Sequence, residues 1–595
     1  MRQMNRVVAG VALLVIGMCA GSGAQVLDQA PSNALGVFEV KNMQGASTKV
    51  AALAKKLGID QMDPRWSDPL GSLMTQMHLK KGIRKDGDMA IAFFNPQKNA
   101  PKVENADANA PKDDQPPLVI LIPVDDYKRF LSTGDDGNFE DVKDVGDSIS
   151  QVTVSANHEK LFVIQRDKYA VSSMDKSLLA NHDGIKLQGP AAREAQTKDA
   201  IVYFDVKSVR PQLQKAYESV REEAKKQLQG QNNPVGMSVP PFVFAIYDKI
   251  ASQFLSDTRS ATISMNLNDA GLGSAFIGDF EPDSYLGKLV AESNKTDSPM
   301  LAGLPDRPLL MYGGAVITPK VWDRVLTDLM DTVKQSEGDK VKAEDLNKYL
   351  EDCRKGLKSM TSTTFAMLAP DTGENLMQIV GVTHGDAKQI LEASKDGLSS
   401  ANAFMGMVGG KTKMSVTLGE PTTMDGVQMQ PYNMKFDFDP NDPMAAQQKQ
   451  VMAMMYGPNG LSGVLAVVDD HTLLQAQGVN DKVLAEAIAA AKAGTDTLSK
   501  SDALKITSDQ LPKPRGAEFY IAIDEIANTA VKFMKQQGMA IQFKLPPNLP
   551  PVGMAVSKEG SAIQFDSFIP TKLVEAVTSA VMQTMMQMNG GGKGV

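Results

Sequence analysis

The segment Ala170-Val-Ser-Ser-Met-Asp-Lys-Ser-Leu178 decides the fold, because the chain repeats it as Ala476-Gln-Gly-Val-Asn-Asp-Lys-Val-Leu484. Alanine, aspartate, lysine and leucine stand at the same spacing in both segments. Repetition at this scale is typical of a chain that contains more than one copy of a structural unit. The pair therefore predicts an internal duplication.

A second pair of segments occurs in the same order along the chain. Met265 to Gly271 leads to Phe280-Glu-Pro282, as Met554 to Gly560 leads to Phe568-Ile-Pro570. Because both pairs keep their order, we expect a first copy at residues 31–295 and a second copy at residues 305–586.

The apolar pattern within each copy combines strands with helices. Ile201 to Val206 alternates as a half-buried strand does, and Leu213 to Leu228 follows with helical spacing. Hairpins such as Met89–Phe93 with Leu118–Ile122 imply antiparallel pairing. The expected class is α+β, with two homologous lobes that are each a mainly antiparallel sheet with helices packed on one face.

Composition is that of a folded, acidic protein. The chain has 595 residues, of which 42% are hydrophobic and 22% charged, and its formal net charge is −8. Two lobes of this length match the upper range of single domains. A negative surface without a basic block argues against nucleic acid as a partner.

The N-terminus has the pattern of a signal peptide. A basic start at Arg2 and Arg6 precedes an apolar run that is too short for a membrane span of about 20 residues. Ser22 and Ala24 are small enough to direct cleavage after Ala24, so residues 1–24 are the expected signal peptide. The chain is then exported to the periplasm or the exterior without a transmembrane anchor. Lipidation at Cys19 is the less favoured alternative, because Met18 stands where a small residue is needed.

The two copies differ at several places. Residues 97–117 read as a disordered insert of the first copy, residues 242–256 as a helix that only the first copy has, and residues 589–595 as a flexible tail. Both copies carry a proline-marked connection that is longer than usual. Its apolar residues form a candidate partner surface, with packing over the protein's own core as the alternative: Met237, Val239, Met539, Ile541, Phe543, Leu545 and Leu549.

Catalytic and ligand-binding motifs are incomplete wherever they begin. Gly406 to Thr412 lacks the first glycine of a phosphate loop, since Met405 stands at its place. Asp437 to Gln448 lacks the turn glycine and the closing glutamate of a calcium loop. His471 follows Asp469 and Asp470 after an apolar strand, without a nucleophile elbow. We therefore assign no catalytic, cofactor-binding or metal residue and expect no cofactor.

Two longer stretches carry a family resemblance. Leu118-Val-Ile-Leu-Ile-Pro-Val-Asp-Asp-Tyr127 and Tyr203-Phe-Asp-Val-Lys-Ser-Val-Arg-Pro211, together with the signal peptide, resemble uncharacterised exported bacterial proteins built from a duplicated domain of unknown function. The resemblance implies export and duplication and brings no activity with it.

The sequence therefore favours a protein that is not an enzyme. We expect an exported envelope protein that binds a protein, peptide or apolar ligand between or along its lobes, because pockets often form where domains meet. The first alternative is an exported hydrolase with a site near Asp469 and His471, and the second is a structural cell-surface protein.

Overall fold

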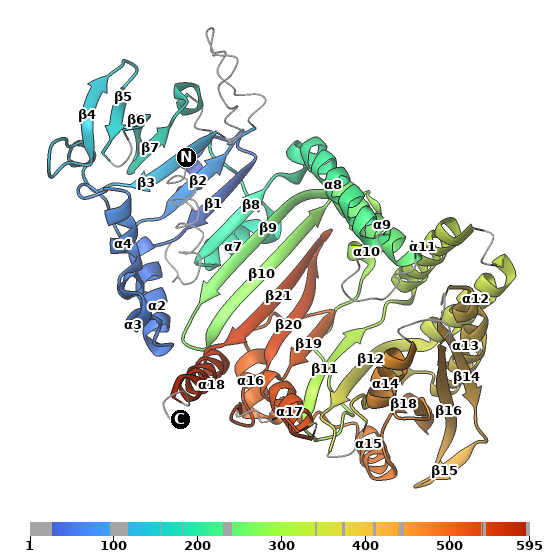
Figure 1. Ribbon diagram of the computed structural model, residues 1–595. Coiled ribbons are helices and arrows are strands. Elements are labelled where there is room, and N and C mark those ends of the chain that lie inside the picture. The colour runs from blue at the N-terminus through green and yellow to red at the C-terminus, as the bar shows by residue number, and fades with distance from the viewer. Residues whose placement is uncertain are drawn as a thin grey trace. The chain divides into compact units, whose positions relative to one another are not determined.

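The computed structural model describes most of the chain. The described residues are 26–95, 117–155, 158–180, 183–229, 241–338, 342–371, 375–408, 412–438, 445–536, 538–539 and 543–590. The expected signal peptide, almost all of the insert at 97–117, and residues 591–595 of the expected tail lie outside them. The chain forms two compact units, and both mix helices with antiparallel sheet (Figure 1), as the α+β prediction requires.

Unit 1 comprises Met1–Pro211, Thr258–Glu281 and Ala562–Ser579. Its strands pair antiparallel in the order β4–β5–β6–β7–β3–β2–β1–β8–β9–β10–β21. The strands are β1 (Gly36–Val40), β2 (Met89–Phe93), β3 (Leu118–Pro123), β4 (Phe139–Asp144), β5 (Ile149–Val154), β6 (Lys160–Arg166), β7 (Tyr169–Ser173), β8 (Ala200–Phe204), β9 (Thr258–Leu267), β10 (Gly271–Phe280) and β21 (Ala562–Pro570).

Short helices surround this sheet. They are η1 (Leu27–Gln29), α2 (Met43–Lys56), α3 (Ile59–Met62), η2 (Pro64–Ser67), α4 (Pro69–Gln76), α6 (Tyr127–Phe130), η3 (Lys176–Leu179) and α7 (Gly189–Thr197). Helices α8 (Val206–Gln229) and α18 (Thr571–Gly590) begin in unit 1 and end beyond it.

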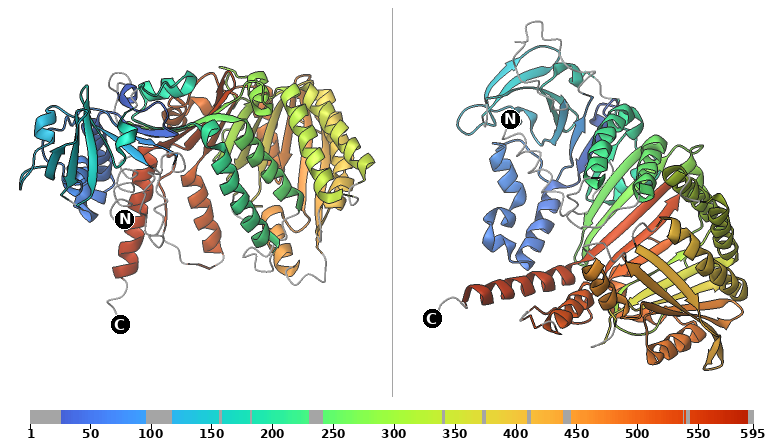
Figure 2. Two further views of the ribbon diagram at one scale, coloured as in Figure 1. Left: turned by 90° about the horizontal axis from the view of Figure 1, so that it is seen from above. Right: turned by 45° about the vertical axis from the view of Figure 1, so that its right-hand side comes forward.

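Both faces of the middle strands of unit 1 are covered, so the expectation of helices on one face is wrong here. Val37 packs with Leu27 of η1, Leu178 of η3 and Ala195 of α7 in one apolar cluster. Its neighbour Phe38, which points the other way, packs in a second cluster with residues of α2 and α4, the blue helices of Figure 2. The reason is that β1 to β3 are apolar at nearly every position and not at alternate ones.

Unit 2 comprises Gln212–Asp257, Pro282–Ser561 and Ala580–Val595. Its strands pair antiparallel in the order β14–β16–β17–β18–β13–β12–β11–β19–β20, and β15 pairs with the end of β16. The strands are β11 (Leu309–Val316), β12 (Met360–Leu368), β13 (Ile379–Gly385), β14 (Thr412–Leu418), β15 (Thr422–Met424), β16 (Val427–Phe438), β17 (Leu461–Asp469), β18 (Thr472–Gln477), β19 (Ala517–Ile521) and β20 (Val552–Glu559).

Long amphipathic helices accompany the second sheet. Leu391 and Leu398 of α13 pack on Tyr432 and Leu465 of the sheet, and α9, α11 and α12 share a cluster around Met330. The helices are α9 (Pro241–Asp257), α10 (Tyr285–Glu292), α11 (Pro319–Glu337), α12 (Ala343–Ser359), α13 (Ala387–Val408), α14 (Ala445–Tyr456), α15 (Asp481–Ala493), η5 (Leu498–Lys500), α16 (Asp502–Ser508) and α17 (Ile523–Gln536).

Candidate binding face

Four neighbouring strands of unit 1 expose large apolar side chains on one side of the sheet. Phe204 of β8 and Ile263 of β9 are each 40% exposed, Phe565 of β21 is 45% exposed, and Ile569 is 37% exposed. Phe276 of β10 lies opposite both Ile263 and Phe565, and its ring centre is 6.4 Å from that of Phe565. We call these five residues the open face. Figure 1 shows α7 behind the strands and no described helix in front of the middle of β9 and β10.

The opposite side of the same strands is buried and polar. Thr258, Ser260, Thr262 and Ser264 stand at alternate positions of β9, and none of them is more than 7% exposed. Gln564 and Asp566 on β21 are 7% and 9% exposed. Antiparallel strands with one covered face normally turn apolar residues inward and polar residues to water. Here that pattern is reversed.

Helix α7 explains why the polar side can be buried. Ser264 donates a hydrogen bond to the carboxylate of Glu194 on α7. The Arg193 guanidinium donates to Oε1 of Gln564 at 3.1 Å, and Nε2 of Gln564 donates to Oδ1 of Asp566 at 2.9 Å. These partners satisfy polar groups whose burial would otherwise be costly. Burial nevertheless raises the pKa of Asp566 to about 6, against the opposing effect of the Gln564 hydrogen bond.

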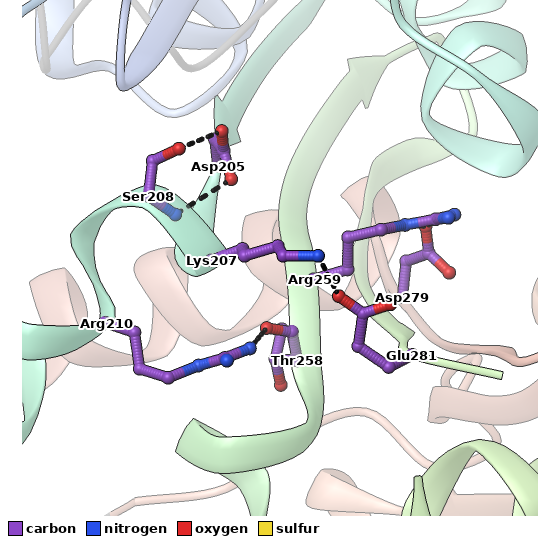
Figure 3. Close-up of polar contacts among 8 residues, drawn as sticks. All are labelled: Asp205, Lys207, Ser208, Arg210, Thr258, Arg259, Asp279 and Glu281. Atoms are coloured by element: carbon purple, nitrogen blue, oxygen red, sulfur yellow. Dashed lines mark hydrogen bonds and ion pairs between the residues drawn. The ribbon is translucent and has the colours of Figure 1, made fainter. Parts of the chain in front are cut away.

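Two ion pairs lie at one end of these strands (Figure 3). Nζ of Lys207 is 2.8 Å from Oε1 of Glu281, and the Arg259 guanidinium binds Oδ2 of Asp279. The hydrogen bond from Lys207 holds the pKa of Glu281 below its usual value. Each cation has a carboxylate partner, and such partly exposed pairs contribute little stability. We therefore regard them as the solvated border of the open face and not as an anion site.

The same close-up shows how α8 begins. Oδ1 of Asp205 accepts a hydrogen bond from the backbone N–H of Ser208, which satisfies one of the free donors of the first helical turn. The Arg210 side chain donates to the carbonyl oxygen of Thr258 at 3.0 Å. These contacts fix α8 to the start of β9.

The predicted histidine region forms a polar cleft in unit 2. A cavity of about 760 Å³ is lined by His384, His471, Asp470 and Ser359, among others. Asp469, which precedes His471 by two residues, accepts a hydrogen bond from the backbone N–H of His471 at 2.7 Å. Burial lowers the pKa of His384.

The cleft has two hydroxyl groups, those of Ser359 and Thr361, and each donates to a group other than an imidazole. Ser359 donates to Oε1 of Gln389 at 3.0 Å, and Asp470 pairs with Lys388 at 3.0 Å. Within the described ranges, neither imidazole hydrogen-bonds a hydroxyl group, so the nucleophile and base of a serine hydrolase are not joined.

The predicted partner surface on the proline-marked connections is not one exposed patch. Met237, Val239 and Ile541 lie outside the described residues. Met539 is 47% exposed, whereas Phe543 and Leu549 are half-buried.

Leu545 corrects the prediction, because it is buried at 1% exposure. The Asn528 side chain of α17 binds both its backbone N–H and its carbonyl group, and Asp524 accepts from the backbone N–H of Leu549. The described part of the second connection around Leu545 and Leu549 therefore packs against α17 of its own unit.

Three further features concern metal ligands, membrane spans and the described cysteine. No three His, Cys, Asp or Glu residues there are grouped so as to hold a metal ion. No described helix is both long and apolar enough to cross a membrane. Cys353 is half-buried in α12, and burial raises the pKa of its thiol, so the reactive thiolate is disfavoured.

Comparisons with known proteins add no family. No family model matches the chain, and no curated protein matches it. Three crystal structures of TP0453, in crystal forms III, I and IV, align with 9% identity. They cover 48–49% of this chain and 98–100% of their own length, with TM-scores of 0.19–0.20. At these scores the alignments support no conclusion about fold or function.

Proposed function

We propose that this chain is an exported, non-catalytic binding protein whose open face receives an apolar ligand. The observation that carries the proposal is the reversed pattern of β9 and β21, where Ser264 and Asp566 are buried while Ile263 and Phe565 meet solvent. Exposed apolar patches of this kind mark binding surfaces on soluble proteins. Export rests on the signal-peptide pattern of residues 1–24.

The size of the open face is sufficient for measurable binding. Burying a large apolar side chain contributes about 1.5–3 kcal/mol. Phe204, Ile263, Phe565 and Ile569 are each about two-fifths exposed, so covering the exposed part of all four contributes roughly 2–5 kcal/mol. The cost of immobilising the ligand is subtracted from this gain, so we expect weak binding unless polar contacts add to it.

The open face is tested with a fluorescent apolar probe. We expect the full chain to bind 1-anilinonaphthalene-8-sulfonate, and the double variant Ile263→Ser, Phe565→Ser to bind it about tenfold more weakly, because roughly half of the exposed apolar area is lost. The matched control is Met62→Ser, since Met62 is 79% exposed in unit 1 but lies on α3, away from these strands.

Equal binding by the double variant and the control would contradict the proposal. A hydrolytic activity that survives the double variant but disappears in His471→Ala at an unchanged melting temperature would support the hydrolase alternative. The observation that favours that alternative is the cleft that brings His384 and His471 together.

We also infer that residues 31–295 and residues 305–586 are two copies of one fold. The inference is supported by strand order, because β4–β5–β6–β7–β3–β2–β1–β8–β9 and β14–β16–β17–β18–β13–β12–β11–β19–β20 follow the same path through each sheet. Asp175 precedes η3 just as Asp481 begins α15.

An experimental structure tests the duplication. We expect residues 31–295 and 305–586 to superpose with Asp175 on Asp481, and Pro282 on Pro570. The matched segments would then lie on equivalent strands and helices of the two copies. Coordinates that place them on unrelated elements would refute the inference.

A further inference from the structure

Three helices of unit 2 line an apolar cavity of about 170 Å³ that is open to solvent on one side. It lies among α9, α10 and α11, and Ile250, which is 61% exposed, stands at its opening. The lining is almost wholly apolar in exposed area, although several residues have polar ends: Ile246, Lys249, Ile250, Gln253, Tyr285, Leu286, Leu289, Val325, Asp328, Leu329 and Thr332.

The packing of α11 explains why a space remains. Met330 and Val333 face a closed cluster with Phe242 of α9 and Leu346 of α12. One to two turns earlier, Val325 lines the cavity and is only half-buried. The helices are thus packed together around Met330, whereas the apolar side chains around Val325 are left uncovered.

Three residues with polar ends, Lys249, Tyr285 and Asp328, lie at the edge of the cavity and contribute little to its exposed lining. Nζ of Lys249 is 3.1 Å from the side-chain oxygen Oδ1 of Asp328. It also donates to the backbone carbonyl oxygen of Asp328 at 3.2 Å. Burial, and next the hydrogen bond to Asp328, raise the pKa of Tyr285. An ionised carboxylate has about four acceptor positions, and these two partners leave positions for a further donor.

We propose that this cavity binds a single-ring apolar molecule that carries a hydroxyl group, with the ring between α9, α10 and α11 and the hydroxyl donating to Asp328. An apolar cavity of about 150 Å³ can hold benzene, so this volume suits one ring and little more. The site lies in unit 2, shares no residue with the open face, and does not depend on the function proposed for that face.

The test compares p-cresol with toluene on the full chain by ligand-observed NMR titration. We expect both to bind, with p-cresol about tenfold tighter, because only its hydroxyl reaches a charged acceptor. Asp328→Ala is expected to remove this preference while leaving toluene binding within about twofold. That result would separate a polar anchor from mere apolar partitioning.

A second experiment fills the cavity with a larger side chain. Val325→Phe is expected to weaken both ligands by at least about tenfold, because the added ring occupies their place. Val321→Phe is the matched control on the same helix, since Val321 does not line the cavity. If melting shows that Val325→Phe is unfolded, Leu286→Phe from α10 replaces it.

The proposal is overturned if neither ligand binds, if Val321→Phe weakens binding as much as Val325→Phe, or if toluene binds as tightly as p-cresol. Failure of probe binding at the open face would leave these outcomes unaffected. The Ile263→Ser, Phe565→Ser variant should bind p-cresol like the unmodified chain, so the two proposals can fail separately.

Discussion

Replacing Phe568 with alanine is expected to lower the free energy of unfolding by about 3–5 kcal/mol, the cost typical of removing a buried phenylalanine ring. Phe568 lies on the covered side of β21 and is 2% exposed. Its ring occupies the space beside Gly271 of β10, where a methyl group added to the glycine would lie 2.7 Å from the ring carbon Cζ. Denaturant unfolding followed by circular dichroism measures the change.

The matched control is Phe565→Ala on the same strand. Phe565 is 45% exposed on the open face, so we expect a smaller loss of about 1–2 kcal/mol. The pair of variants reports which side of β21 faces inward. A larger loss for Phe565→Ala than for Phe568→Ala would show that the reversed pattern is wrong and that the open face is covered.

Replacing Glu39 with glutamine is expected to stabilise the chain by on the order of 4 kcal/mol at pH 8 and to change little at pH 4.5. Burial raises the pKa of Glu39 from 4.5 to about 8, and a shift of one unit corresponds to about 1.4 kcal/mol. Because the folded state holds this proton more tightly than the unfolded chain, the stability that the neutral Glu39 carboxyl contributes is complete below pH 4.5 and is lost as the pH rises toward 8.

Thermal unfolding across this pH range measures the effect. Neither carboxylate oxygen of Glu39 has a hydrogen-bond partner among the described residues, so the glutamine leaves no partner behind. Glu222→Gln is the exposed control and should leave the pH profile unchanged. Asp566, whose pKa burial raises to about 6, is one of the groups that contribute to the pH dependence that remains. Destabilisation of Glu39→Gln at pH 8 would instead indicate an ionised pair with the neighbouring Lys41.

Sequence patterns predict where helices and strands lie along the chain better than they predict which side of each is buried. The apolar run at Val464–Val468 lies within β17, and the stretch 242–256 lies within α9. Both follow from local periodicity. The alternation of Thr258, Ser260, Thr262 and Ser264 likewise shows a two-sided strand. Which side is buried depends on Glu194, a residue of α7 that only the tertiary fold brings near, so the open face could not be predicted.

The candidate sites show the same limit. Asp469 to His471 can be recognised as a polar cluster because its members are consecutive. His384 joins the cleft only because β13 pairs with β18, which places His384 opposite Thr472. The prediction of a surface position for Leu545 is wrong because the sequence does not reveal that Asn528 binds its backbone. The pattern of a single sequence does not show which distant segments contact each other.

The pairing of β10 with β21 sets an order of events during synthesis. Unit 1 recruits its last strand from residues 562–570, whereas the strand it pairs with is complete by residue 280. Domains generally fold as they emerge, and contacts between distant segments form slowly. A nascent first unit must therefore wait with Gly271–Phe280 as an unpaired edge, the kind of edge that attracts wrong partners. Any delay in the arrival of residues 562–570 would prolong the exposure of that edge.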